Sequence, residues 1–360
     1  MMHIKKITPE TGLDLLAVED NITTKTKLMS FIPFKFIVYL RVLKNRKKLK
    51  EGFHYDAKLQ EAYSSAIVTG DTQEKLNALI TLAYHNIEKG LSLRSPRPLF
   101  GRAAIRRLNV RLQRYVTEFG WTKSASVALN VLNEYRHFNL TKGKEDPELE
   151  KIITSLLNIK VAPNAGEKKG GTKILNKEEI HAACKVDLSS FFAMRSSVRN
   201  YSQENVAEID IVAAVKMAQK TPSVCNRQSG RVTAVNNKEL INNLLNLQGG
   251  ARGFDDQVPC LLIITSDLSS FQAPAERYQC WIDGGLFAMS LIYALHSLGL
   301  GTCCLNWSKM PHQDEALYSM LPHCQGERVI MMLAVGHYPD SLTVPQSASP
   351  AMDDVLRWQR

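Results

Sequence analysis

The chain has 360 residues, 44% of them hydrophobic and 22% charged, which is an ordinary globular composition. Domains commonly hold ~100 to 200 residues, so this length predicts two folded units. The net charge of +10 is unevenly spread: residues 1–160 hold 27 Lys and Arg against 16 Asp and Glu, whereas the rest is close to neutral. The basic character of the chain therefore belongs to its N-terminal part.

The cysteines and the first residues bear on the compartment. The first twenty residues carry four acidic side chains and no apolar run, so we expect no secretory signal. All seven cysteines lie between Cys184 and Cys324, their number is odd, and none belongs to a C-x-x-C pair. This pattern argues against a disulfide framework and a structural zinc site. We therefore expect a cytoplasmic protein without a metal site.

The first patterned stretch is residues 28–50, where an apolar, aromatic run passes directly into a basic run. The apolar run is too short for a membrane span of ~20 residues and contains Pro33 and Lys35. We favour a helix that docks on the rest of the protein with a solvated basic end. Peripheral contact with anionic lipid through residues 28–50 is the less favoured alternative.

Residues 1–159 are predicted to form a basic, mainly helical N-terminal extension. A first helix starts with Asp71 as its cap and ends at Gly90. Near its end, His85 and Glu88 stand one turn apart, a spacing that metal sites use. No second pair completes a coordination shell, so a structural ion pair or a core histidine is favoured.

A second helix is predicted from the apolar positions between Ile105 and Tyr115, and a third over about 124–138. The second helix has five arginines on its outer face: Arg102, Arg106, Arg107, Arg111 and Arg114. Such a face could touch nucleic acid, but no aromatic stacking platform or nucleic-acid-binding motif accompanies it. We favour a solvated or partner-facing helix and expect no nucleic-acid partner.

Residues 160–180 are predicted to be a linker, because Gly, Pro, Asn and Lys dominate their first part without an apolar period. Residues 181–360 then show the mixed pattern of an α+β domain. We expect helices over 188–194, 207–219, 238–247 and 275–298, and strands over 231–235, 259–265 and 328–335. The helix over 275–298 is apolar on nearly every side and must be buried all round, for which a homodimer interface is the natural place.

Residues 195–201 read R-S-S-V-R-N-Y and place two cations and two hydroxyls within five positions. Arginine offers a planar fork of donors that fits phosphate oxygens, and serine hydroxyls add short hydrogen bonds. A solvated basic turn after a helix would explain the same residues. Three more motifs follow in order: P-S-x-x-N-x-Q over 222–228, G-L-G-T over 299–302 and V-G-H-Y-P over 335–339.

This ordered series resembles the nitroreductase family of flavoproteins, from about residue 186 to the C-terminus. The resemblance implies an FMN-binding α+β fold, a central sheet flanked by helices, that dimerises through its central helices and holds FMN at the interface. It implies cofactor contacts from Arg195, Ser196, Ser197, Arg199, Pro222, Ser223, Asn226, Gln228, Arg252, Cys304, Leu305 and Asn306.

The resemblance also implies roles for these residues. Arg195 matches the cation that binds the phosphate, Ser197 a hydroxyl beside the phosphate, and Arg199 a cation near the flavin pyrimidine. A fixed cation there stabilises the negative charge of the reduced ring. The turn over 222–226 matches the one that reaches the flavin from the other subunit, and Arg252 is a weaker candidate at the flavin edge.

On the flavin ring itself, the resemblance places Cys304 and Leu305 against one face. The backbone N–H groups of Asn306 and Trp307 would face flavin N5 and O4. No ionisable catalytic side chain is implied, because the flavin carries the hydride and the protein orients the reactants. We expect Cys303 and Cys304 to be small apolar filler rather than a redox dithiol.

The sequence departs from the family after the V-G-H-Y-P motif. Family members commonly place one or two cations there, which close on the phosphate, whereas residues 346–350 read Q-S-A-S-P with no cation before Arg357. We expect that Arg195 and Arg199 suffice or that the basic extension supplies the charge, with weak or lost FMN binding as the third alternative.

The function implied by the resemblance is an FMN-dependent oxidoreductase with ping-pong hydride transfer. NADH or NADPH would reduce the flavin, and an unidentified small-molecule substrate, in vitro a nitroaromatic or quinone, would take the electrons. The alternative is a non-catalytic scaffold or a peripheral protein that works through its basic N-terminal extension. The extension also loosely resembles one found in bacterial nitroreductase-like proteins linked to surface polysaccharide synthesis.

Overall fold

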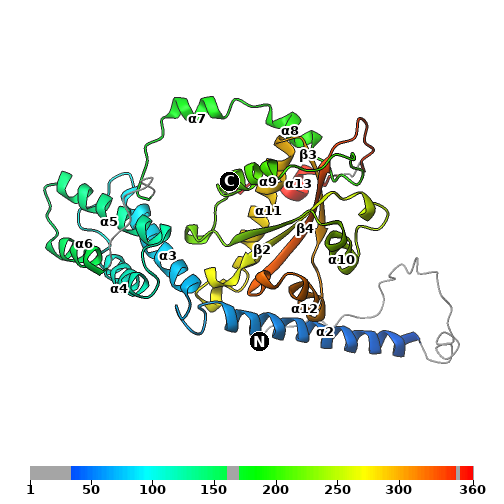
Figure 1. Cartoon of the computed structure of the whole chain (residues 1–360), viewed down its shortest axis with the longest axis horizontal. Helices are drawn as coiled ribbons and strands as arrows, with labels where there is room; N and C mark the ends of the chain where they lie inside the picture. Colours follow the sequence, from blue (N-terminus) through cyan, green and yellow to red (C-terminus); the bar gives the residue numbers. More distant parts are fainter. Residues whose placement is uncertain (1–33, 160–169, 346–348, 360) are drawn as a thin grey trace. The chain divides into compact units, whose positions relative to one another are not determined.

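The structure is a computed structural model that describes residues 34–159, 170–345 and 349–359 (Figure 1). Contacts between residues divide the chain into two compact units, 1–54 and 55–360. The sequence-based boundaries at 160 and 180 stay a prediction.

The described part of the first unit is the beginning of helix α2 (Phe34–Tyr63). Its apolar side chains Phe36 and Leu49 are exposed. The lipid contact considered for residues 28–50 stays a prediction, and residues 28–33 lie outside the described ones. Within the described ranges, no helix is long and apolar enough to cross a bilayer.

Four helices between residues 73 and 159 share a hydrophobic core of their own: α3 (Gln73–Leu91), α4 (Arg102–Phe119), α5 (Lys123–Thr141) and α6 (Pro147–Ile159). The first three correspond to the predicted helices, and α6 was not predicted. The predicted cap of α3 was wrong by one residue. Thr72 is the N-cap and accepts a hydrogen bond from the Lys75 N–H, while Asp71 forms an ion pair with the Lys75 ammonium at 2.8 Å.

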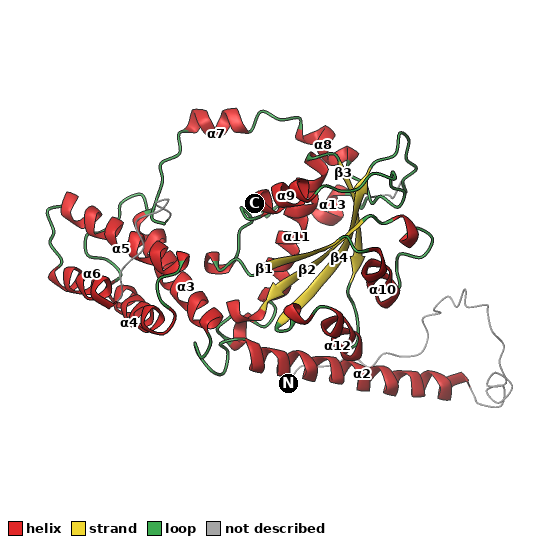
Figure 2. Ribbon diagram, in the orientation of Figure 1, coloured by secondary structure: helices red, strands yellow, loops and turns green. Residues whose placement is uncertain are grey.

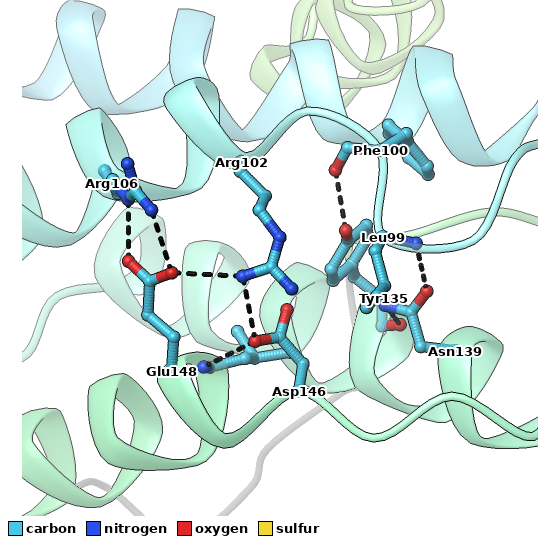
Figure 3. Close-up of polar contacts among 9 residues, drawn as sticks. Leu99, Phe100, Arg102, Arg106, Tyr135, Asn139, Asp146 and Glu148 are labelled. Atoms are coloured by element: carbon cyan, nitrogen blue, oxygen red, sulfur yellow. Dashed lines mark hydrogen bonds and ion pairs between the residues drawn. The ribbon is translucent and has the colours of Figure 1, made fainter.

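Polar contacts fix the loop between α3 and α4 and the start of α6 (Figure 3). The Tyr135 hydroxyl donates to the Phe100 carbonyl at 2.6 Å, and the Leu99 N–H donates to Asn139 Oδ1 at 2.8 Å. Two arginines of the predicted outer face form ion pairs with the start of α6: Arg102 contacts Asp146 and Glu148, and Arg106 contacts Glu148. These two cations therefore hold α4 to α6.

Gly90 lies inside α3 and does not end it, because the helix continues to Leu91. Its role is close packing: a Cβ atom added at Gly90 would lie 2.0 Å from Cε2 of Phe100. Overpacking a core costs about 1–3 kcal/mol. We expect Gly90→Ala to lower the free energy of unfolding in urea by about that amount. Gly52→Ala, in a helix with nothing within 4 Å of the added Cβ, is the control, and equal stability of the two variants would contradict this packing.

Residues 170–172 are hydrogen-bonded to this group of helices. The Gly171 N–H donates to Glu88 Oε1 at 2.9 Å, and the Thr172 N–H donates to Glu134 Oε1 at 2.7 Å. His85 Nδ1 lies 3.1 Å from the other oxygen of Glu88. The His85–Glu88 pair therefore has the structural contacts that the sequence favoured.

The mixed part of the chain is built on a four-stranded antiparallel sheet with the strand order β1-β2-β4-β3 (Figure 2). The strands are β1 (Gly230–Val235), β2 (Cys260–Asp267), β3 (Leu300–Asn306) and β4 (Glu327–His337). The helices are α7 (Lys177–Ala183), α8 (Leu188–Met194), α9 (Glu208–Ala218), α10 (Lys238–Gln248), α11 (Gln279–Ser297), α12 (Pro311–Met320) and α13 (Met352–Val355). Short 3-10 turns lie at Val224–Asn226, Asp255–Gln257, Leu268–Ser270, Pro274–Glu276 and Pro322–Cys324.

Helices cover both faces of this sheet. Alternate strand residues point to opposite sides, and apolar side chains on each side pack against helices. On one face, Leu262, Leu333 and Val335 pack under α9 and α11. On the other face, Ile263 and Ala334 pack with α10 and α12. The predicted α+β class, a central sheet flanked by helices, is confirmed.

Helix α11 packs on the sheet with one side only in the single chain, and its burial on all sides at a homodimer interface stays a prediction. Phe287, Leu291 and Leu295 are buried against the sheet, whereas Ile282 and Leu286 are exposed in the single chain. The helix therefore has one apolar stripe on the sheet and a second one that the described residues leave exposed.

Candidate functional site

The R-S-S-V-R-N-Y segment runs along the edge strand β3. Ser197 pairs with Thr302 in a short parallel bridge, and the Val198 N–H donates to the Thr302 carbonyl at 2.8 Å. Val198 is fully buried, and Gly301 leaves room for it, because a Cβ atom at Gly301 would lie 2.9 Å from the Val198 side chain. The Tyr201 hydroxyl donates to the Val198 carbonyl at 2.9 Å. This segment is therefore fixed beside β3.

Among the described residues, the two arginines of the segment have no acidic partner, because no carboxylate there forms an ion pair or a hydrogen bond with Arg195 or Arg199. Arg195, Ser196 and Ser197 are half-buried. Partial burial raises the pKa of the Cys304 thiol, and the Arg195 guanidinium acts on that pKa in the opposite direction. Cations that lack a carboxylate partner among the described residues, beside two serine hydroxyls, form a site that suits an anion.

Strand β3 presents a short open strip next to these cations. Cys304 and Asn306 are exposed on one face, whereas Cys303 and Leu305 point into the hydrophobic core on the other. Leu305 is 4% exposed in the single chain, and the ligand contact expected for it stays a prediction. Neighbouring residues of a strand point to opposite faces, so Cys303 and Cys304 are not arranged as a dithiol. All seven cysteines are free.

The backbone at the end of β3 is held by two buried polar side chains that the sequence did not single out. Gln248 Nε2 donates to the Asn306 carbonyl at 2.9 Å, and Trp307 Nε1 donates to Asp314 Oδ1 at 2.6 Å. Gln248 ends α10, so the loop that follows it and carries Arg252 starts beside β3. The carboxamide and the carboxylate act from other elements of the fold, which the local sequence cannot show.

The P-S-x-x-N-x-Q turn is strained and firmly held. Cys225, Asn226 and Gln228 all have φ near +50°, a region that costs non-glycine residues about 1–3 kcal/mol each. The Val224 N–H donates to the buried carboxylate of Asp283 at 3.1 Å. Arg227, almost fully buried, forms two hydrogen bonds with Glu276. Strain of this kind is maintained where the surrounding structure imposes it, and such residues cluster at functional sites.

A cavity of about 540 Å³ lies beside this turn. Pro222, Ser223 and Gln228 line it, together with residues of α9, β1 and α11. Its size falls in the range of small-molecule pockets. Arg195, Arg199 and Cys304 are not among the residues that line it.

The predicted site residues therefore form two groups in the single chain. Thr302, beside Ser197, pairs with Val335 of β4, whereas Gly230, which follows the turn, is connected through β2 to Arg328 of β4. From the strand spacing and the rise per residue, the two corners lie about 14 Å apart across the sheet and about 23 Å along it. We name them the β3 group (Arg195, Ser196, Ser197, Arg199, Cys304, Asn306) and the turn group (Pro222, Ser223, Asn226, Gln228).

In the described ranges, no group of three or more His, Cys, Asp or Glu side chains is placed to hold a metal ion. The segment after the V-G-H-Y-P motif, in which the family's phosphate-binding cation is missing, is described only in part. Residues 346–348 lie outside the described ones, and residues 349–359, including Arg357, are exposed.

Solved nitroreductase structures match about half of the chain. An FMN-dependent nitroreductase from Clostridium difficile R20291 is 21% identical, covers 47% of this chain and 98% of its own, and has a TM-score of 0.40. A nitroreductase family protein from Streptococcus pneumoniae TIGR4 is 16% identical over 48% of this chain and 100% of its own, with a TM-score of 0.42. NfrA2 from B. megaterium is 22% identical over 48% of this chain and 74% of its own, also with a TM-score of 0.42.

No protein-family model matches the chain, and no curated protein matches it significantly. Because the structural similarities are weak, a function has to be assigned from the residues of this chain.

Proposed function

We propose that the chain is an FMN-dependent oxidoreductase. The observation that supports this most is the β3 group, in which Arg195 and Arg199 have no acidic partner among the described residues and lie beside the exposed strip of β3. Guanidinium and hydroxyl groups suit a phosphate, and an open strand edge suits a flat ring system. Bound FMN would supply the hydride transfer between a reductant and an acceptor.

In this proposal, the residues of the chain bind and orient the cofactor. Arg195, Ser196 and Ser197 would hold the phosphate, and the charge of Arg199 would stabilise the ring when reduction makes it negative. Cys304 and the backbone N–H groups of Asn306 and Trp307 would contact the ring. Gln248 and Asp314 keep that backbone in place, and Arg252 stands at the rim.

We further propose that the protein works as a homodimer. The turn group lies too far from the β3 group to act on the same ligand within one chain. The apolar stripe of α11 that the described residues leave exposed offers a surface for a second copy. Ile282 and Leu286 are 53% and 47% exposed there. A second copy would cover this stripe and bring its own turn group to the β3 group of the first.

The dimer is tested by Leu286→Glu, which places a charge in the middle of the exposed stripe of α11. Burying an unpaired charge costs several kcal/mol. We expect this variant to sediment as a monomer and to lose affinity for FMN together with the dimer. Leu140→Glu, at a leucine of α5 that is 51% exposed, is the control. A Leu286→Glu dimer with full FMN affinity would contradict the two-chain site.

The reductant in this proposal is NADH or NADPH, and the acceptor is a small molecule such as a quinone or nitroaromatic compound in vitro. Initial rates at varied concentrations of both substrates test the mechanism. Parallel double-reciprocal lines are expected for ping-pong transfer, and intersecting lines would contradict it. The seven free cysteines fit a reducing compartment, so we propose a cytoplasmic enzyme.

A further inference from the structure

Tyr338, the fourth residue of the V-G-H-Y-P motif, lies at the same edge of the sheet as the β3 group. Its ring packs on Gly301, where an added Cβ atom would lie 3.1 Å from Cε1 of Tyr338. Gly301 precedes Thr302, which pairs with Ser197. Burial raises the pKa of Tyr338, and the charge of Arg195 lowers it. The packing on Gly301 places the Tyr338 ring one residue along β3 from the Thr302–Ser197 bridge.

His296 holds Tyr338 and the end of α8 at the same time. Its Nδ1 lies 3.0 Å from the Tyr338 hydroxyl, and its Nε2 lies 3.1 Å from the Phe191 carbonyl. A carbonyl can only accept, so the proton must be on Nε2, and the Nδ1 of the neutral ring then accepts the Tyr338 proton. The remaining lone pairs of the Tyr338 oxygen are left to accept a further hydrogen bond.

Phe191 belongs to α8, whose last residue, Met194, immediately precedes Arg195. By binding the carbonyl in the middle of this short helix, His296 holds the segment that leads into Arg195. A tilted contact between the rings of Phe191 and His296 and an edge contact between those of His296 and Tyr338 support the same arrangement. His296 thus connects α11, α8 and the end of β4 at the cation site.

We propose that Tyr338 is a ligand-contacting residue of the β3 group and that His296 is its positioning residue. This inference rests on the proposed function. Arg195 binds the phosphate of the ligand, and the Tyr338 oxygen accepts a hydrogen bond from a hydroxyl group of the polyol chain next to that phosphate. An acceptor beside a cation selects a phosphate that is attached to a polyol over an isolated anion.

The test compares three flavins on full-length protein by fluorescence titration. FMN has phosphate and polyol chain, riboflavin has the chain alone, and lumiflavin has neither. Loss of one neutral hydrogen bond corresponds to about 2- to 10-fold in affinity. We expect Tyr338→Phe to weaken FMN and riboflavin by that factor and to leave lumiflavin unchanged. Tyr293→Phe is the matched control, because it removes the hydroxyl of a different half-buried tyrosine, which lies on α11.

Two further variants test the positioning role of His296. His296→Leu should reproduce the loss for FMN and riboflavin, whereas His296→Gln, which keeps a donor and an acceptor, should restore part of it. Urea midpoints of all variants show whether the fold is retained. Unchanged riboflavin affinity in a folded Tyr338→Phe variant, or an equal loss for lumiflavin, would overturn the inference. A wild-type protein that binds none of the three flavins would instead overturn the proposed function.

Discussion

Replacing Arg195 with alanine should lower the affinity for FMN by about 10- to 150-fold, the worth of one charge-assisted hydrogen bond. Arg195 has no acidic partner among the described residues, so the variant leaves no buried carboxylate unpaired. The loss should therefore appear in ligand binding and hardly in stability.

This expectation is specific for the phosphate. Affinity for riboflavin, which lacks the phosphate, should stay within about 2-fold, because the ring and chain contacts remain. Fluorescence titration at fixed salt measures both ligands, since phosphate contacts weaken with ionic strength. Arg136→Ala, at an arginine whose side chain is 39% exposed and pairs with Glu150, is the control. Equal losses for FMN and riboflavin, or no loss for FMN, would contradict the assignment of Arg195.

Replacing Arg328 with methionine should cost about 3–5 kcal/mol of unfolding free energy, because it leaves a buried carboxylate without its partner. Arg328 contacts Asp314 at 3.1 Å and Asp56 at 3.0 Å, and its guanidinium lies 5.1 Å from the centre of the Trp281 ring. Asp314 is buried and also accepts the hydrogen bond of Trp307. The substitution thus disturbs the support of the β3 end as well as the core.

The pH dependence of this loss has a defined sign. Burial raises the pKa of Asp314, and Arg328 acts against that effect, so its removal raises the pKa of Asp314 further. A carboxyl group with a raised pKa in the folded state is less costly once it is protonated. The deficit of Arg328→Met should be full at neutral pH and should shrink as the pH falls through the pKa of Asp314.

Urea unfolding at several pH values measures this. Arg231→Met, which breaks an ion pair between a 45% exposed arginine and Asp267, is the control and should cost at most about 1 kcal/mol. A deficit of Arg328→Met that equals the control, or that grows towards acid pH, would contradict the role given to the buried pair.

Periodicity in the sequence was enough to predict most helices and three of the four strands. Strand β3 was not predicted, because Gly301 to Asn306 form a short run directly after a helix and only pairing with β4 reveals their alternation. The same alternation decides that Cys304 faces outward and Leu305 inward. A family motif names both residues but cannot say which one offers its side chain.

The turn group shows a second limit. Asn226 is a common turn residue, but nothing in the local sequence predicts positive φ values at Cys225 and Gln228. Contacts with Asp283 and between Arg227 and Glu276, about 50 or more residues away, impose that conformation. The separation of the turn group from the β3 group likewise follows from the strand order, which the motifs do not contain.

The most direct test of the central claim is the visible absorbance spectrum of the purified protein, recorded with added FMN before and after anaerobic NADH or NADPH. We predict a protein-bound flavin band that survives gel filtration and bleaches with at least one of the two nucleotides. Absence of bound flavin at excess FMN would contradict the proposed site. A bound flavin that neither nucleotide reduces would contradict the proposed reaction while leaving the site intact.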